Sequence, residues 1–390
     1  MKQIKTIIAS ICRTLLGIVF IFSGAVKAID PLGTVYKIED YLKAFGGTFT
    51  DLLPAAETAA WILIILECLL GVCMVLNVRT KWTMWISLLF YCVMTPLTLY
   101  IALANPVSDC GCFGDAVVLT NWQTFWKNVV LIILAITLVS LKKYLNPLWR
   151  GWMEMVIAVT TVMVMSSFMI WTTHHLPVID FRPYKVGNHL PTIMEDYEPD
   201  QVEYLYTCEK DSVRETFTAE NYPDSTWKLV SWEQKIIKKG YESPIHDFEI
   251  INANGDDITG DLLESENPVT LVIMYDLAKA DKSQMEKIIA LYQNEETYDE
   301  YLVYNDSTPT DSLDNEEVDY YEIENTSNIY ILTGSGASDV EEFAIEYPSL
   351  AEHICTCDPV TLKTIVRANP GVIVLQAGTV IDKYNLRNRY

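Results

Sequence analysis

Hydrophobic and polar positions follow different patterns in the two parts of the chain. The first 173 residues contain five long apolar runs, and a helix needs about 20 such residues to cross a bilayer. The predicted membrane helices cover residues 4–28, 54–76, 82–104, 122–141 and 152–173. Because four more runs follow the first, we expect the first to be a retained helix and not a cleaved signal peptide. The remaining residues form short apolar runs of strand length among helical ones, as in a soluble α/β protein.

The charge distribution supports the same division. The chain has 390 residues and a formal net charge of −23. Its first 173 residues carry 12 Lys and Arg against 9 Asp and Glu, whereas the remaining 217 carry 16 against 42. A membrane part is therefore followed by a strongly acidic soluble part. A nucleic-acid binder is excluded, because a phosphate backbone would be repelled by the acidic part and the basic residues form no patch.

The short loops predict the orientation in the membrane. One set of loops is basic and contains Lys2, Lys5, Arg79, Lys81, Lys142, Lys143 and Arg150. The other set is mainly acidic, with Lys27, Lys37 and Lys43 as exceptions. Cytoplasmic loops are enriched in Lys and Arg, so we expect a bacterial inner-membrane protein with a cytoplasmic N-terminus. Residues 29–53, residues 105–121 and everything after His174 are then periplasmic.

The soluble part is predicted to hold a connecting segment and a domain. Residues 145–181 form the fifth membrane helix and a linker, residues 182–244 a small β-rich segment, and residues 245–390 an α/β domain. Strands are expected at 247–256 with a Gly turn, 269–275, 328–332 and 353–357, and helices near 282, at 337–347 and at 359–368. A hairpin of 372–376 and 379–384 closes the chain. Strands alternating with helices imply a partly parallel sheet.

Residues 293–327 contain 12 Asp and Glu and no Lys or Arg. Carboxylates bind calcium, but the spacing of oxygen ligands around a turn glycine that defines a calcium loop is missing. We interpret this stretch as a solvated loop.

The nine cysteines fall into two groups. Cys12, Cys68, Cys73 and Cys92 lie within predicted spans, where cysteine usually packs as a small hydrophobic residue. The other five lie on the predicted periplasmic side, where thiols tend to pair or exchange. Four of these form two pairs with one intervening residue, Cys110-Gly-Cys112 and Cys355-Thr-Cys357.

The spacing of Cys110 and Cys112 favours a reactive disulfide. In an extended chain, residues i and i+2 lie about 6.6 Å apart, at the upper limit for a disulfide, so bridging needs a bend that Gly111 permits. Asp109 and Asp115 are expected to raise the thiol pKa values, which disfavours a standing thiolate. A structural bridge and a metal site are the alternatives, although zinc sites usually have two to four intervening residues. For Cys355 and Cys357, redox activity and burial in a strand are equally compatible with the sequence.

Glu67 lies in the middle of an apolar run, where a carboxylate costs about 2.5–3.5 kcal/mol on insertion scales. We expect it to face the bundle interior, either as a structural partner of a buried hydroxyl or of Arg13, or as a proton acceptor or quinone contact. Arg13 lies nearer the cytoplasmic face and is the weaker candidate for cofactor binding.

The segment Asn105-Pro-Val-Ser-Asp-Cys-Gly-Cys-Phe-Gly-Asp115 and the opening segment Phe20-Ile-Phe-Ser-Gly-Ala-Val-Lys27 resemble the DoxX/MauE family, the latter named for methylamine utilisation. The resemblance covers roughly residues 8–141. It implies a four-helix membrane bundle over residues 1–144, akin to quinone-linked disulfide-forming proteins. It also implies a role in periplasmic thiol chemistry or in maturing a disulfide-rich partner.

Residues 245–390 resemble a thioredoxin-like domain of the peroxiredoxin-related kind. Asn369-Pro370-Gly371 matches the cis-proline turn of that family, and Ala377-Gly-Thr-Val-Ile matches its last hairpin. The segment from Asp276 to Gln284, where the family carries its redox cysteines, contains none. The resemblance therefore implies a domain that docks or presents a client.

These residues favour one of three functions. The favoured one is thiol–disulfide exchange through Cys110 and Cys112, with electrons passing to a membrane quinone or to another protein and a periplasmic protein as client. The alternative is a non-enzymatic assembly or anchoring factor with structural cysteines. A small-solute carrier is disfavoured because only one span carries a charge at mid-membrane.

Overall fold

A computed structural model describes the chain over residues 2–107, 110–145, 148–149, 151–210, 213–238, 240–241, 243–245, 247–291 and 328–388. The acidic stretch 293–327 lies outside these residues. The chain forms two compact units, one of residues 1–182 with 384–390 and one of residues 183–383.

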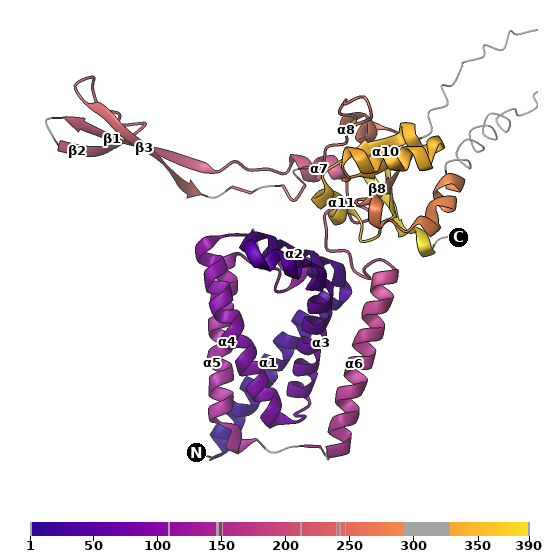
Figure 1. The fold of residues 1–390 in the computed structure, drawn as a ribbon. Coiled ribbons are helices and arrows are strands. Elements are labelled where there is room, and N and C mark those ends of the chain that lie inside the picture. The colour runs from indigo at the N-terminus through magenta and orange to yellow at the C-terminus, as the bar shows by residue number, and fades with distance from the viewer. Residues whose placement is uncertain are drawn as a thin grey trace, which may run out of the picture. The chain divides into compact units, whose positions relative to one another are not determined.

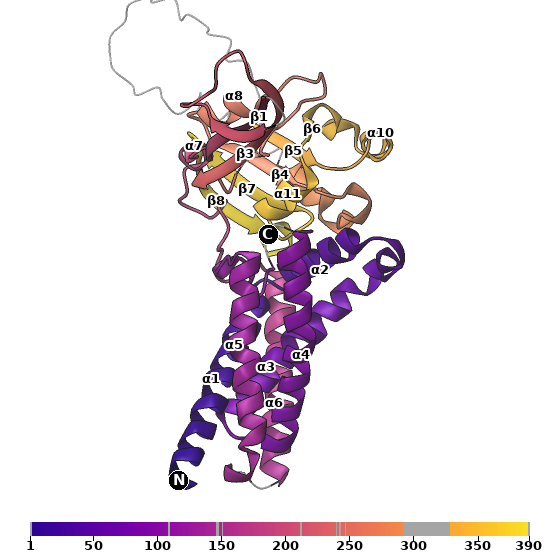
Figure 2. The same ribbon diagram turned by 90° about the vertical axis from the view of Figure 1, so that its left-hand side faces the viewer.

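Helices make up the first unit (Figures 1 and 2). They are α1 (Lys2–Ile29), α2 (Pro31–Phe45), α3 (Ala56–Val75), α4 (Thr80–Ala104), α5 (Asn121–Ser140) and α6 (Gly151–His174), with short 3-10 helices η1 (Gly47–Ala55), η2 (Gly114–Ala116) and η3 (Lys142–Tyr144). Among the described residues, five helices are long and apolar enough to cross a membrane: α1, η1 with α3, α4, α5 and α6. They match the five predicted spans, and α2 is an additional helix in the first predicted periplasmic loop.

Glycines bring α1 and α3 into close contact. A Cβ atom added at Gly24 would lie 2.4 Å from Cys68 Sγ, and one at Gly71 would lie 2.6 Å from the backbone nitrogen of Ile21. Small residues let membrane helices approach this closely, which strengthens van der Waals packing between them. The main core then joins α1, α3, α4 and α5 through Leu16, Phe20, Met74, Tyr91, Leu131 and other buried residues.

Helix α6 packs less extensively. Its buried residue Met169 contacts Ala28 of α1 and Ile64 of α3, and Thr172 donates a hydrogen bond of 3.1 Å to the Ala28 carbonyl. The side-chain amides of Asn385 and Asn388 each donate to the His174 carbonyl at 3.0 Å. The last residues of the chain therefore cap the end of α6.

The second unit contains two sheets. The first consists of β1 (Gln201–Lys210), β2 (Val213–Thr218) and β3 (Lys228–Lys238) in the antiparallel order β2-β1-β3, which agrees with the predicted β-rich segment. The second consists of β4 (Val269–Ile273), β5 (Ile329–Thr333), β6 (Ile354–Thr356), β7 (Gly371–Gln376) and β8 (Thr379–Asn385). Its order is β6-β5-β4-β7-β8, with β4, β5 and β6 parallel and β7 antiparallel to β4.

Helices α7 (Leu190–Glu195), α8 (Thr259–Glu264), α10 (Ala337–Glu346) and α11 (Pro359–Ile365) complete this unit, with a helical stretch at 285–291. The predicted strand at 247–256 is wrong in extent. Only Ile251 makes β-bridges there, to Asp257 and Thr356, before the Gly255 turn. The Asn369–Pro370 bond is cis, as predicted.

Candidate functional site

The loop between α4 and α5 brings Cys110 and Cys112 into contact. Their Sγ atoms lie 3.2 Å apart, at hydrogen-bond distance between two free thiols. Gly111 between them has a φ of +61°, a conformation that costs other residues about 1–2 kcal/mol. The bend predicted for Gly111 is confirmed.

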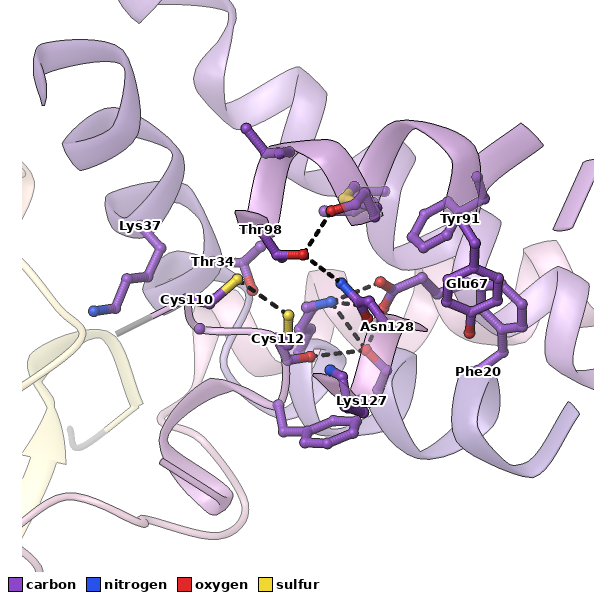
Figure 3. A pocket seen from close by; sticks show the side chains of 18 of the residues that line it. Phe20, Thr34, Lys37, Glu67, Tyr91, Thr98, Cys110, Cys112, Lys127 and Asn128 are labelled. Atoms are coloured by element: carbon purple, nitrogen blue, oxygen red, sulfur yellow. Dashed lines mark hydrogen bonds and ion pairs between the residues drawn. The ribbon is translucent and has the colours of Figure 1, made fainter. Parts of the chain in front are cut away.

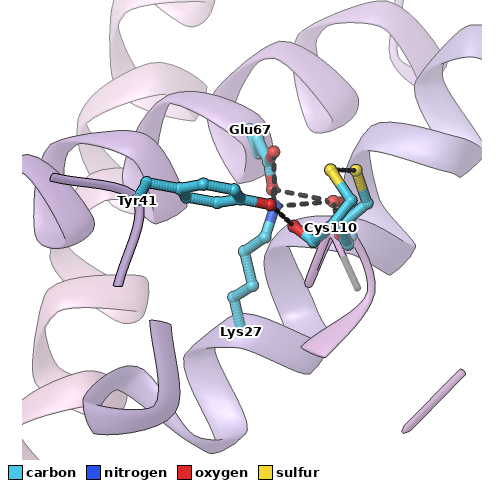
Figure 4. A network of polar contacts seen from close by, with 6 residues as sticks. Lys27, Tyr41, Glu67 and Cys110 are labelled. Atoms are coloured by element: carbon cyan, nitrogen blue, oxygen red, sulfur yellow. Dashed lines mark hydrogen bonds and ion pairs between the residues drawn. The ribbon is translucent and has the colours of Figure 1, made fainter. Parts of the chain in front are cut away.

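Hydroxyl groups of α1 and α2 hold this loop by its backbone (Figure 4). The Tyr41 hydroxyl donates to the Cys110 carbonyl at 2.7 Å. Ser23 Oγ lies 2.8 Å from the Cys112 carbonyl. On the side of α5, the Asn121 amide donates to the Val107 carbonyl at 2.9 Å. The two thiols are thus positioned by three different helices.

A buried ion pair lies beside the loop. Lys27 Nζ is 2.7 Å from Glu67 Oε1 and 2.8 Å from Oε2, and the two side chains are 7% and 4% exposed. Ser23 Oγ accepts from Lys27 Nζ at 3.0 Å and lies 2.9 Å from Glu67 Oε2. Burying a lone carboxylate among apolar helices is costly, and the ammonium compensates its charge.

The packing of α1 against α3 produces this pair. Ser23, Gly24 and Lys27 occupy neighbouring turns of one side of α1. Gly24 fits against the backbone of Cys68, and the adjacent Glu67 side chain then reaches Lys27. The close approach of the helices is what makes a contact between residues 40 positions apart possible.

A cavity of about 360 Å³ lies among α1 to α5 and reaches the two cysteines (Figure 3). Most of its lining is apolar, and three of its aromatic residues are Phe20, Phe90 and Tyr91. Its polar lining includes Ser23, Lys27, Tyr41, Glu67, Lys127 and Asn128. Apolar pockets with a few convergent polar groups are typical of sites for small organic ligands.

The charges around the loop distinguish the two thiols. A hydrogen bond from Cys110 lowers the pKa of Cys112, and Lys127 and Lys27 lower it further, while burial and Glu67 oppose them. The same hydrogen bond, together with burial, raises the pKa of Cys110. The expectation that acidic neighbours raise both pKa values is wrong for Cys112. Asp109 lies outside the described residues.

Glu67 does not pair with Arg13, which was one of its two expected structural partners. It contacts Lys27 and Ser23, a buried hydroxyl as predicted, whereas Arg13 Nη1 donates to the Met74 and Val75 carbonyls and does not line the cavity. Lys27 was not predicted as a partner of Glu67, because it was counted among the basic exceptions in the acidic loops. The signal available was the placement of Ser23 and Lys27 four residues apart on one helix.

Cys355 and Cys357 lie in the second unit, at β6 and directly after it. Both are buried, and burial raises the pKa of Cys355 to about 11 and that of Cys357 to about 12. The Cys357 amide donates to the Thr333 carbonyl at 3.0 Å, which fixes the backbone there. This geometry fits the strand-burial interpretation of the pair and leaves its redox role as a prediction.

Three of the four cysteines in spans, Cys12, Cys68 and Cys73, are buried as expected. Cys92 is exposed on the surface of α4 and does not pack in the protein core. Within the part of the chain that the structure describes, no three His, Cys, Asp or Glu side chains gather to hold a metal ion.

Comparison with known proteins adds two matches. Residues 5–141 match the model of a family described as methylamine utilisation protein MauE. Residues 202–239, which include β1 and β3, match a domain of unknown function (DUF8463). No curated protein and no solved structure matches the chain.

Proposed function

We propose that Cys110 and Cys112 are a redox pair that exchanges disulfides with a client protein and is reoxidised by a quinone dissolved in the bilayer. In the first step, a client dithiol reduces the Cys110–Cys112 disulfide through a mixed disulfide, and the client leaves with the disulfide. In the second step, two electrons and two protons pass from the two thiols to the quinone. The quinone leaves as a quinol, and the disulfide forms again.

The observation that carries this proposal is the cavity that the two thiols line. Its apolar and aromatic walls lie at the depth of the membrane helices, which suits a lipid-soluble ring. The thiolate is the reactive form of cysteine, and the neighbourhood of Cys112 favours its thiolate. A buried structural pair would need neither the cavity nor the cations.

We further propose an inner-membrane location with the cysteine loop on the periplasmic side. Cys112 contacts Ser23, near the C-terminal end of α1. Basic residues gather at the other end of the bundle, where Lys5 Nζ lies 5.5 Å from the Tyr144 ring centroid and Lys142 Nζ 5.4 Å from that of Trp85. The positive-inside bias makes that end cytoplasmic. The likeness of residues 5–141 to a methylamine utilisation protein supports a role in maturing a partner protein.

For residues 245–390 we propose a thioredoxin-like domain that docks the client. Its support is the central sheet, in which β5 and β4 are parallel and β7 is antiparallel to β4. Since the segment from Asp276 to Gln284 contains no cysteine, this segment would bind the client and not exchange disulfides with it. Cys355 and Cys357 are its candidate exchange residues, and their burial requires an opening of the strand before either reacts.

Thiol labelling in intact membranes tests the redox pair. Membranes are incubated with reduced or oxidised quinone, alkylated with a membrane-permeable reagent, and analysed by peptide mapping of residues 105–121. We expect both thiols to be alkylated with quinol and protected as a disulfide with quinone. Cys92, which is exposed on α4, serves as the internal control, and its labelling should not follow the quinone state.

The competing function is a non-enzymatic anchor with structural cysteines. It predicts a pair that stays oxidised whatever the quinone state, and that result would overturn the redox proposal. In the Cys112→Ser variant, Cys110 retains a thiol without its resolving partner and should trap a mixed disulfide. A cross-link to Cys355 or Cys357 in the peptide map would identify an internal relay, and a cross-link to another protein would identify a separate client.

A further inference from the structure

Ser23 connects the buried ion pair to the cysteine loop. Its hydroxyl has one proton and two acceptors within reach, Glu67 Oε2 at 2.9 Å and the Cys112 carbonyl at 2.8 Å. Lys27 Nζ contacts Ser23 Oγ and both carboxylate oxygens of Glu67, so its three protons have acceptors. The ammonium is therefore fixed one hydroxyl group away from the backbone of Cys112.

Among the described residues, two lysines and one carboxylate influence the pKa of Cys112. Within the described part of the chain, the charged and titratable groups around the cysteine loop are Lys27, Asp30, Lys37, Tyr41, Glu67, Tyr91, Cys110, Asp115, Lys127 and Arg182. Lys127 Nζ lies 4.2 Å from the centroid of the Phe113 ring, next to Cys112 in the chain. Glu67 opposes these lysines at Cys112, and it is paired with Lys27. Neutralising Lys27 makes the charge near the sulfur more negative by one unit, and neutralising Glu67 makes it more positive by one unit.

We propose that Lys27, Ser23 and Glu67 form a positioning triad that sets how readily the Cys110–Cys112 disulfide is reduced. Lys27 stabilises the reduced pair by its positive charge, Glu67 limits that effect, and Ser23 holds the loop at a fixed distance from both. This inference rests on the proposed redox function and concerns the regulation of the same site.

The balance of the reduction explains the direction of each effect. The disulfide takes up two electrons and two protons to give two thiols, and the electrons come from the client dithiol. Where Cys112 is ionised in the reduced state, the disulfide takes up two electrons and one proton and gives one thiol and one thiolate. A cation beside Cys112 stabilises that thiolate and hence the reduced state, and an anion destabilises it.

Two isosteric substitutions with opposite expected effects test the triad in the full-length protein. Lys27→Met removes the positive charge, so the pKa of Cys112 should rise by about one unit, a tenfold fall in the ratio of thiolate to thiol. Glu67→Gln removes the negative charge, so the same pKa should fall. The readout is the pH profile of alkylation of the peptide that contains both cysteines.

A second readout is the equilibrium of the pair with glutathione redox buffers. We expect Lys27→Met to favour the disulfide by about five- to tenfold and Glu67→Gln to favour the dithiol by a similar factor. Tenfold corresponds to about 30 mV for this two-electron couple. Lys27→Arg keeps the charge and should stay close to the wild-type midpoint. Lys43→Met removes an exposed cation of α2 that pairs with Glu39 at 3.9 Å, and should shift nothing.

The outcomes separate the triad from the proposed function. Suppose that the wild-type pair titrates and follows the quinone state, but that Lys27→Met and Glu67→Gln shift the pKa of Cys112 and the glutathione equilibrium in the same direction or leave both unchanged. The triad is then wrong and the redox function stands. If the wild-type pair never changes with the quinone state, the redox function itself is wrong. Should Lys27→Met fail to fold, Lys127→Met removes one positive charge from α5 and must shift the glutathione equilibrium toward the disulfide.

Discussion

Replacing Gly24 by alanine should separate α1 from α3 at the level of the ion pair. The new Cβ would lie 2.4 Å from Cys68 Sγ and 2.9 Å from the Cys68 backbone nitrogen. Non-bonded heavy atoms prefer about 3.5–4.0 Å, so the neighbouring helix must move by about 1 Å. Because the second contact is to backbone, a rotation of the cysteine side chain does not relieve it.

The loss of unfolding free energy caused by Gly24→Ala follows from three contributions. Overpacking of this kind costs about 1–3 kcal/mol. Lengthening the 2.7 Å contact between Lys27 and Glu67 by about 1 Å weakens their attraction by about 1.7 kcal/mol at an effective dielectric constant of 20. Alanine in place of glycine within a helix returns about 1 kcal/mol. The expected net loss is about 2–4 kcal/mol of unfolding free energy.

Unfolding in detergent micelles, followed by the fluorescence of the 10 tryptophans, measures this loss. The matched control is Gly151→Ala at the start of α6, where an added Cβ has no neighbour within 4 Å. Cys68→Ala combined with Gly24→Ala removes the sulfur contact and should restore part of the stability. A Gly24→Ala variant as stable as the Gly151→Ala control would refute the argument that this glycine sets the helix separation.

Three further predictions concern the loop and the topology. Gly111→Ala should cost about 1–2 kcal/mol because of its φ of +61°, and should slow alkylation of both thiols, measured by thermal unfolding and labelling rates. Cys112 should be alkylated at a pH below the ordinary thiol pKa of about 8.5, and Cys110 only far above it. The reason is that the shared hydrogen bond lowers the pKa of Cys112 and raises that of Cys110. A single alkylation midpoint near 8.5 would contradict this. Reporter fusions should be cytoplasmic after Lys81 and Arg150 and periplasmic after Asn105 and Asp180.

The elements that local patterns specify were predictable. Each membrane helix contains enough consecutive apolar residues to be recognised on its own, and the helices agree with the predicted spans within a few residues. Strands β4 and β5 are short runs composed mainly of β-branched, aromatic and other apolar residues. Residues 247–256 show a similar pattern but pair only at Ile251, because strand formation requires a partner that the pattern does not contain.

Contacts between helices were less predictable, because they depend on how each helix is rotated. Hydropathy does not distinguish a residue facing lipid from one facing the core, so it could not separate the exposed Cys92 from the buried Cys12, Cys68 and Cys73. Arg13 and Glu67 are both polar residues in spans and were considered as partners. They belong to different levels of the bundle, since Arg13 contacts the Met74 carbonyl at the end of α3.

The pKa of Cys112 shows most clearly that the sequence alone does not reveal contacts between distant residues. Electrostatic effects depend on distance in space and not on distance along the sequence. Lys127 lies 15 residues after Cys112 and Lys27 lies 85 residues before it, yet both lower its pKa. Lys27 is held there by a carboxylate from a third helix, through a contact that requires a glycine. The reactivity of the loop therefore depends on the packing of α1 against α3, and a substitution at Gly24 should change both.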